Sequence, residues 1–252
     1  MPKQDFRTPR LHVEAPLGSA ARISLSRGQA NYLANVLRLG AGEPVLVFNG
    51  TDGEWRAKIV ADKKTLGLEV LEQTRAQTAA GDLEYLFAPL KHARLDYMVQ
   101  KAVEMGVSRL RPVLTRHTQT SRVNLARMRA NAIEAAEQCG ILNLPEIDAP
   151  VALEKLIARW TPTRLLVFCD EDAEIADPVA ALVPARAGGL VDALPVSLLV
   201  GPEGGFAEEE RAAIAKLPNV IRLALGPRLL RADTAAVAAL ALVQAVLGDW
   251  RR

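Results

Sequence analysis

The sequence has few of the residues that mark metalloenzymes, disulfide-rich proteins and membrane proteins. Cys139 and Cys169 are its only cysteines and lack CxxC spacing, so neither a zinc site nor a disulfide scaffold is predicted. Its three histidines are far apart, and it contains no HExxH motif, paired-carboxylate spacing or GxSxG elbow. The longest apolar stretch, residues 235–247, is too short to cross a bilayer and is typical of a buried helix. We therefore expect a soluble, cytoplasmic protein with no metal and no membrane partner.

The net charge of +2 conceals an uneven distribution along the chain. Residues 91–131 contain nine Lys and Arg against two Asp and Glu, whereas residues 132–252 have an acidic excess. A basic stretch of this kind can attract a polyanion such as a nucleic acid. It is equally compatible with a solvated helix face whose acidic partners lie elsewhere in space. Charge alone therefore leaves nucleic-acid binding open.

The first 75 residues contain short runs of strand length that mix apolar and polar residues and are separated by turn signals. Strands are predicted over residues 10–14, 21–26, 43–50, 54–60 and 66–72. Helical spacing is found in residues 27–40, and Gly40 supplies a stop. These elements predict a small barrel-like module, followed by a polar linker over residues 74–82.

Beyond the linker, buried strands alternate with helices. Strands are predicted over residues 83–90, 108–115, 164–170, 194–201 and 220–226. Helices are predicted over residues 92–106, 124–140, 152–160, 207–217 and 232–248. Such alternation indicates a parallel α/β sheet covered on both faces. We therefore predict a small β-rich domain followed by a larger α/β domain.

The motif GPEGGF (201–206) follows a predicted strand and precedes a predicted helix, where free backbone N–H groups can meet a ligand. It lacks the Lys-Ser/Thr of a Walker A loop and does not fit GxGxxG. The three glutamates at 208–210 already complement the helix dipole, which argues against a phosphate ligand. A tight turn that needs positive φ at Gly204 or Gly205 is the alternative.

A second loop, LALGPRLLRADT (223–234), repeats this arrangement of a strand, Gly-Pro and a helix. Loops that follow two strands of one parallel sheet meet at its carboxyl edge, where open α/β sheets bind ligands. The pair therefore predicts a ligand held by backbone groups and apolar walls.

The motifs LLVGPEGGF and LALGPRLLRADTA together resemble the cofactor-binding motifs of SPOUT-class methyltransferases. NYLANVLRL (31–39), residues 91–113 and EAAEQCG (134–140) extend the similarity over essentially the whole chain. The chain most closely resembles the RsmE-type enzymes of this class, which methylate ring nitrogen 3 of one uridine in 16S rRNA of the small ribosomal subunit.

The resemblance implies a PUA-like, RNA-binding β-barrel over residues 1–76 and a SPOUT α/β domain with a trefoil knot over residues 77–252. It also implies S-adenosyl-L-methionine as the cofactor, 16S rRNA within the small ribosomal subunit as the substrate, and a homodimer. The cofactor pocket implied by the motifs comprises Leu199, Gly201, Glu203, Gly205, Leu223, Leu225, Gly226 and Leu230.

Methyl transfer to a uracil imide nitrogen requires that the nitrogen lose its proton. Arg231 is the first candidate to stabilise the developing charge, with Arg228 and Arg94 as alternates. Glu203, Asp233 or water could accept the proton. Contacts with the RNA are expected from Arg38, Lys91, Arg94, Arg116, Arg122 and Arg228.

The sequence departs from the family pattern at two places. Arg-Ala-Asp-Thr (231–234) replaces the common Arg-Thr-Glu-Thr, and Ile141 stands where an arginine is often found. Two other classes of function stay open. A non-catalytic RNA-binding or ribosome-assembly factor would not bind the cofactor, and the missing GxGxxG counts against a dinucleotide-dependent oxidoreductase.

Overall fold

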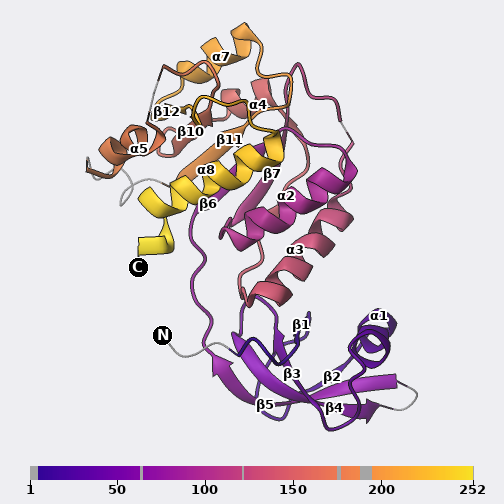
Figure 1. Cartoon of the computed structure of the whole chain (residues 1–252). Coiled ribbons are helices and arrows are strands. Elements are labelled where there is room, and N and C mark those ends of the chain that lie inside the picture. The colour runs from indigo at the N-terminus through magenta and orange to yellow at the C-terminus, as the bar shows by residue number, and fades with distance from the viewer. Residues whose placement is uncertain (1–4, 63–64, 121, 175–176, 188–194, 252) are drawn as a thin grey trace. The chain divides into compact units, whose positions relative to one another are not determined.

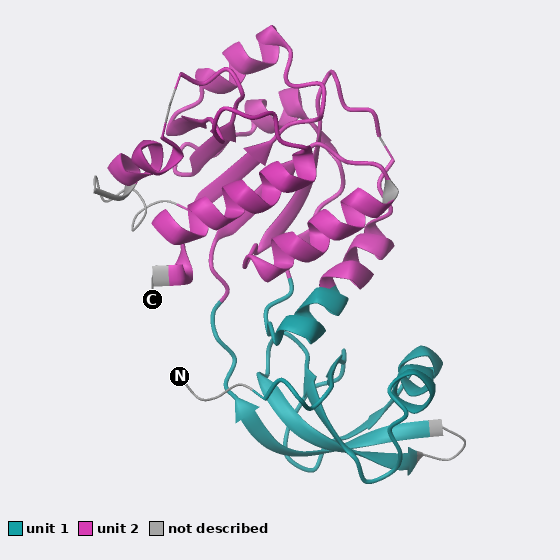
Figure 2. Ribbon diagram, viewed as in Figure 1, with its two compact units in different colours: residues 1–79, 133–144 teal, residues 80–132, 145–252 magenta. Residues whose placement is uncertain are grey.

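The computed structural model describes residues 5–62, 65–120, 122–174, 177–187 and 195–251 (Figure 1). Contacts divide the chain into two compact units (Figure 2). Unit 1 comprises residues 1–79 and 133–144, and unit 2 comprises residues 80–132 and 145–252. The N-terminal unit is thus not a continuous segment, because it also includes the C-terminal part of helix α3 (Leu125–Cys139).

Unit 1 is built on a five-stranded sheet in the order β1-β3-β4-β5-β2. Its strands are β1 (Arg10–His12), β2 (Arg22–Ser24), β3 (Pro44–Phe48), β4 (Glu54–Asp62) and β5 (Thr65–Arg75). Alternate apolar side chains such as Val45, Ile59 and Leu68 form its core, together with Leu33. All five predicted strands are therefore confirmed.

The helix predicted over residues 27–40 is shorter than expected. The Ser26 hydroxyl caps α1 (Arg27–Asn31), and the chain then widens into a π-helical turn, η1 (Tyr32–Val36). Arg38 has a φ of +58°, a left-handed conformation that cannot continue a right-handed helix. The helix therefore ends before Gly40.

Unit 2 contains a wholly parallel sheet in the order β12-β10-β11-β6-β7-β8, with β9 paired to β7. The strands are β6 (Leu83–Phe87), β7 (Arg109–Leu114), β8 (Glu146–Ile147), β9 (Val151–Ala152), β10 (Leu165–Cys169), β11 (Val196–Val200) and β12 (Val220–Leu223). The helices are α2 (His92–Glu104), α4 (Leu153–Ala158), α5 (Pro178–Ala187), α7 (Glu208–Ala215) and α8 (Ala232–Val246), followed by a short 3₁₀ turn, η2 (Asp249–Arg251).

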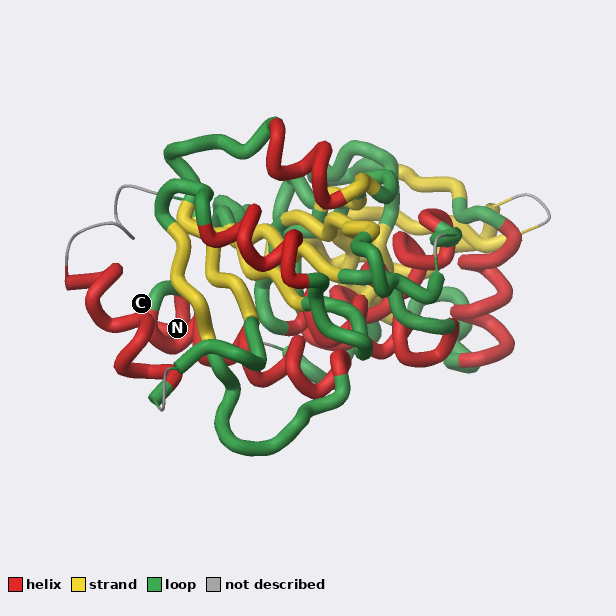
Figure 3. Tube along the Cα trace, turned by 90° about the horizontal axis from the view of Figure 1, so that it is seen from above, coloured by secondary structure: helices red, strands yellow, loops and turns green. Residues whose placement is uncertain are grey.

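Helices cover both faces of this sheet, as Figure 3 shows from above. On one face α8 packs against α2, α5 and β11. On the other face Leu156 of α4 and Ile214 of α7 pack against Leu166 and Leu199 of the strands. The predicted parallel α/β architecture is therefore confirmed, whereas the trefoil knot stays a prediction of the resemblance.

Four elements of unit 2 are absent from the predictions: β8, β9, α5 and the short turn η2. β8 and β9 have two residues each, which is too short to produce a hydrophobic period. Helix α5 carries Pro184 inside it, and an internal proline normally argues against a helix.

None of the helices in the described ranges is long and apolar enough to cross a membrane.

Candidate functional site

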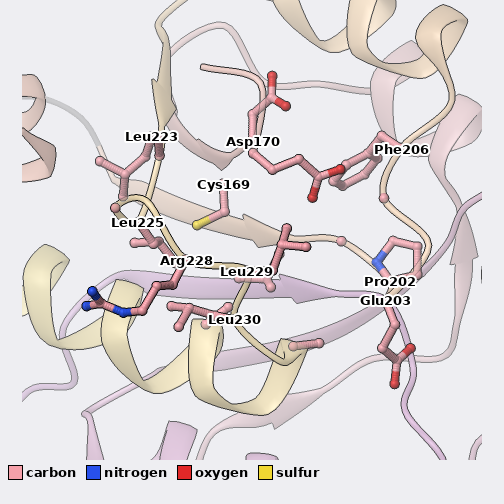
Figure 4. A pocket seen from close by; sticks show the side chains of 18 of the residues that line it. Cys169, Asp170, Pro202, Glu203, Phe206, Leu223, Leu225, Arg228, Leu229 and Leu230 are labelled. Atoms are coloured by element: carbon pink, nitrogen blue, oxygen red, sulfur yellow. The ribbon is translucent and has the colours of Figure 1, made fainter. Parts of the chain in front are cut away.

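A cavity of about 370 Å³ lies where β10, β11 and β12 end. These strands are neighbours in the parallel sheet, so their carboxyl ends meet at one edge. Figure 4 shows the loops that form its walls. The lining residues are Cys169–Glu171, Val200–Glu203, Gly205, Phe206, Leu223–Leu230, Ala232 and Ala235.

The loop after β11 is a tight turn in which the Gly205 N–H donates to the Pro202 carbonyl at 3.0 Å. Gly205 has a φ of +68°, so the predicted positive φ is found there. The Glu210 side chain fixes the end of this loop through two hydrogen bonds from backbone N–H groups. Glu210 Oε2 accepts from Ala207 N at 2.9 Å, and Glu210 Oε1 accepts from Arg116 N at 2.8 Å. Glu210 therefore does more than begin the next helix, because it joins the loop to the segment after β7.

The loop after β12 supplies the apolar wall. Leu223 is buried, Leu225 and Leu230 are half-buried, and all three line the cavity. Leu229 is 91% exposed at the tip of the loop, beside Arg228. Figure 4 shows these leucines on the side of the cavity away from Phe206. An aromatic ring system could lie between such walls.

The segment after β10 forms a third wall that sequence reasoning did not single out. The Asp170 carboxylate is fully buried between Arg211, at 2.6 Å, and Arg222, also at 2.6 Å. The same Arg211 guanidinium pairs with Glu171 at 2.8 Å. Burial, with a smaller effect of Asp170, raises the pKa of the Cys169 thiol to about 12, so this side chain is a neutral wall and not a nucleophile. The sequence indicates this wall only through its position, because Asp170 and Glu171 follow a strand predicted to be parallel and belong to no motif.

The family comparison decides what kind of protein has this site. The model of a family described as "RNA methyltransferase domain" matches residues 77–244, and that of an "RNA methyltransferase PUA domain" matches residues 25–71. The chain belongs to this RNA methyltransferase family. The first match extends over more than half of the chain and includes every loop of the cavity.

Relatives in the family match the chain over nearly its full length. Ribosomal RNA small subunit methyltransferase E of Rickettsia conorii is 29% identical over 237 residues, which are 93% of this chain and 94% of that protein. A Legionella pneumophila structure, described as a methyltransferase with the cofactor SAM bound, is 27% identical with a TM-score of 0.78 and covers 96% of this chain and 99% of that one. The fold also matches a Neisseria gonorrhoeae ribosomal RNA small subunit methyltransferase E bound to S-adenosyl methionine, at 23% identity and a TM-score of 0.83 over 97% of this chain and 100% of that one.

The structure brings together most of the residues expected to bind the family's cofactor. Seven of the eight line the cavity: Gly201, Glu203, Gly205, Leu223, Leu225, Gly226 and Leu230. Leu199 does not line it, because its side chain points into the core between the sheet and α4 and α7. Side chains alternate between the two faces of β11, so Leu199 points away from the side on which the neighbouring Val200 lines the cavity.

The three residues expected to act in catalysis are less closely grouped. Glu203 lines the cavity at its rim, with its carboxylate directed away from Cys169 (Figure 4), and pairs with Arg94 of α2 at 3.6 Å. Arg231 is exposed at the N-cap of α8, and Asp233 is half-buried in the first turn. Neither side chain is among the lining residues.

The basic residues expected to contact RNA are exposed in both units. Arg38 belongs to unit 1, whereas Lys91, Arg94, Arg116, Arg122 and Arg228 belong to unit 2. Arg116 pairs with Glu209 at 3.5 Å, and the neighbouring His117 contacts the Gly204 carbonyl through Nδ1 at 3.1 Å. Part of this basic stretch is therefore attached to the cavity loop. No cluster of metal-ligating side chains occurs in the described part of the chain.

Proposed function

We propose that the chain is an S-adenosyl-L-methionine-dependent methyltransferase that methylates ring nitrogen 3 of a uridine in 16S rRNA of the small ribosomal subunit. One observation carries the proposal. A member of the RNA methyltransferase family has a cavity formed by glycine loops and leucines at the ends of β10, β11 and β12. The Rickettsia conorii relative is named as a small-subunit ribosomal RNA methyltransferase, and the Legionella structure is described with SAM bound.

The residues of the cavity fit such a cofactor. Its volume of about 370 Å³ lies within the range of small-molecule sites, about 300–1,000 Å³. Leu223, Leu225 and Leu230 offer an apolar surface for a purine ring, and the Gly201 and Gly205 backbone admits close approach. Carboxylates at Glu171 and Glu203 suit a cation better than a phosphate. When bound, S-adenosylmethionine supplies an electrophilic methyl group.

The chain's own residues then have to accept the imide proton and stabilise the negative charge that its loss leaves on the uracil. Glu203 is our candidate to accept the proton, because it lines the cavity and its side chain is 38% exposed, so that a substrate can reach the carboxylate. Arg231 is our candidate to stabilise the negative charge that develops on the uracil carbonyl oxygens. It forms no ion pair with any residue in the described ranges, so its guanidinium is available. Asp233 is the alternate proton acceptor.

The RNA is held, in this proposal, by phosphate contacts from the exposed basic residues of both units. The affinity for small-subunit RNA should then fall with salt by about 0.7–0.9 log units per phosphate contact for each log unit of salt. Replacing Arg116 by alanine should reduce this slope by about one. Arg159, which is exposed at the end of α4, is the control, and its replacement should leave the slope unchanged. Salt-independent binding would contradict the RNA part of the proposal.

We further propose that the protein acts as a homodimer in the cytoplasm, where its ribosomal substrate is found. The buried face of α8 packs within its own chain through residues such as Ala239 and Leu240. Its other face carries half-buried apolar residues, including Val237 and Leu242, and is the candidate interface. Light scattering coupled to size-exclusion chromatography should give about twice the chain mass of 27.2 kDa. A monomer at micromolar concentration would contradict this part.

A methyl-transfer assay tests the proposed activity directly. Small-subunit particles and naked 16S rRNA are incubated with tritiated S-adenosylmethionine, and the labelled nucleoside is then identified. We expect 3-methyluridine at one position. Cofactor binding without transfer to either substrate would favour the alternative, a non-catalytic ribosome-assembly factor. Label at another atom or base would refute the assignment to uracil nitrogen 3.

A further inference from the structure

We propose that Glu171 selects the ligand of the cavity by accepting hydrogen bonds from the two vicinal hydroxyls of an unphosphorylated ribose. The inference deepens the proposed function and rests on it for the identity of the cofactor. Glu171 follows β10 and lines the cavity, although no sequence motif indicated it. Its carboxylate stands among walls that are otherwise formed largely by backbone and apolar side chains.

The Arg211 guanidinium holds the Glu171 side chain in a fixed position. Arg211 Nη2 donates to Glu171 Oε1 at 2.8 Å, and the same guanidinium donates through Nη1 to Asp170 Oδ1 at 2.6 Å and to Asp172. Arg211 Nε also donates to the Phe206 carbonyl at 3.3 Å. The Arg211 side chain is only 13% exposed. A guanidinium bound on so many sides cannot move freely, so the carboxylate that it holds has a defined position.

Glu171 is also the acceptor that the cavity leaves available. Both oxygens of Asp170 are occupied, Oδ1 by Arg211 and Oδ2 by Arg222. Glu203 faces Arg94 at the rim. Within the described ranges, by contrast, Glu171 Oε2 has no hydrogen-bond donor, and the side chain is 52% exposed. An ionised carboxylate accepts through both oxygens, and it therefore has capacity for further donors.

Gly205 packs directly against the Glu171 carboxylate. A Cβ atom added at Gly205 would lie only 2.5 Å from Glu171 Oε1, which is closer than a real Cβ atom can approach. Glycine at this position thus lets the carboxylate keep its place beside Arg211, and a larger residue would displace it.

The chemistry of these groups defines the ligand class. Two hydroxyls on adjacent ring carbons present two donors at a spacing that a carboxylate can accept together. A phosphate on either hydroxyl would bring negative charge against Glu171 and Asp170, which costs binding energy in a partly buried site. Glu171 therefore favours a nucleoside such as the adenosine of S-adenosylmethionine over a nucleotide phosphorylated on its ribose.

Titration calorimetry with S-adenosylhomocysteine and its 2′-deoxy and 3′-deoxy analogues tests the inference without measuring activity. A hydrogen bond to a charged group contributes about 1.5–3 kcal/mol, or about 10- to 150-fold in affinity. The wild-type protein should lose affinity by this factor for each deoxy analogue. The Glu171→Ala variant should bind S-adenosylhomocysteine weakly and bind the deoxy analogues equally weakly. Glu171→Gln, which keeps one acceptor, should be intermediate.

Glu208→Gln is the matched control, because Glu208 is an exposed carboxylate in the first turn of α7 that does not line the cavity. This variant should discriminate against the deoxy analogues as the wild type does. Full discrimination in Glu171→Ala would overturn the inference. So would unchanged binding of 5′-methylthioadenosine to that variant, since this ligand keeps the ribose but lacks the amino-acid tail. If the wild type binds no S-adenosylhomocysteine, the proposed function fails and the inference fails with it. Tight wild-type binding with unaltered discrimination in the variant refutes the inference alone.

Discussion

Glu54 and Arg75 are joined by two parallel hydrogen bonds in the interior of unit 1, from Nε to Oε1 at 3.0 Å and from Nη2 to Oε2 at 2.6 Å. Arg10 adds a third, from its Nε to Oε2 at 2.9 Å. Arg75 also donates to the Gly140 carbonyl at 2.9 Å, so the cluster ties the end of β5 to the residue that follows α3. The cluster is one of the contacts that join residues 133–144 to the rest of unit 1.

The cluster predicts a pH-dependent stability. Burial alone would raise the pKa of Glu54, but hydrogen bonds from Arg75, Arg10 and Thr74 lower it below the ordinary value of 4.5. A carboxylate with a depressed pKa stabilises the folded state above that value, and the contribution is lost as the pH falls through the folded-state pKa. Glu54→Gln leaves two buried cations without their anion, and it should lower the free energy of unfolding by about 3–5 kcal/mol near neutral pH.

Urea denaturation at about pH 7 and about pH 3 checks this, and the difference between wild type and Glu54→Gln should shrink at the lower pH. Glu72→Gln on the same sheet is the control. Glu72 pairs with Arg56 at 2.7 Å but is 64% exposed, and its loss should cost less than about 1 kcal/mol. A difference for Glu54→Gln that is equal at both pH values would contradict the assigned electrostatic origin.

Gly205→Ala should weaken cofactor binding at the loop after β11. Alanine at a φ of +68° costs about 1–2 kcal/mol, and its Cβ would also press against Glu171. We expect the affinity for S-adenosylhomocysteine to fall by about 10-fold or more, measured by calorimetry. Gly18→Ala is the control, because a Cβ there meets nothing within 4 Å and the position has no positive φ. Equal affinities of the two variants would show that the loop tolerates a side chain.

The parts of the fold that could be predicted from the sequence are those with a strong local signal. Buried runs such as residues 165–169 and amphipathic runs such as residues 92–104 carry a clear period, and they appear in the structure as β10 and α2. Two-residue strands and the proline-containing α5 carry none. The π-turn at Tyr32–Val36 was also invisible, because it changes the hydrogen bonding without changing the apolar pattern.

The residues of the candidate site likewise fall into those that the sequence indicates and those that only the folded chain brings together. Glycine, proline and leucine in the loops after β11 and β12 indicated a pocket, because their backbone and apolar roles can be read from residue type. Asp170 and Glu171 were missed, because their importance depends on Arg211 and Arg222, which are more than 35 positions away in sequence and reach them only in the folded chain. The motif also gives no indication of which way the Leu199 side chain points, and the structure places that side chain in the core.

Arg231→Ala should slow methyl transfer without weakening cofactor binding. If its guanidinium stabilises charge on the uracil oxygens, removal should lower the single-turnover rate by about 10²- to 10³-fold. The affinity for S-adenosylhomocysteine should stay unchanged, because Arg231 does not line the cavity. Arg231→Lys should recover part of the rate. An unchanged rate in Arg231→Ala would remove this residue from the chemistry, and a loss in Arg228→Ala instead would transfer the role to Arg228.

Glu203→Gln tests the acceptor of the imide proton. Gln has nearly the same shape but cannot take up a proton, so the single-turnover rate should fall by about 10²- to 10⁴-fold at saturating cofactor and RNA. Arg94→Ala removes the same ion pair and keeps the carboxylate, and it should retain most of the rate. Glu209→Gln is the matched surface control, because Glu209 is exposed, pairs with Arg116 and lies outside the cavity. If Glu203→Gln and Glu209→Gln transfer methyl groups at the same rate, Glu203 does not accept the proton, and Asp233 or water has to be tested in its place.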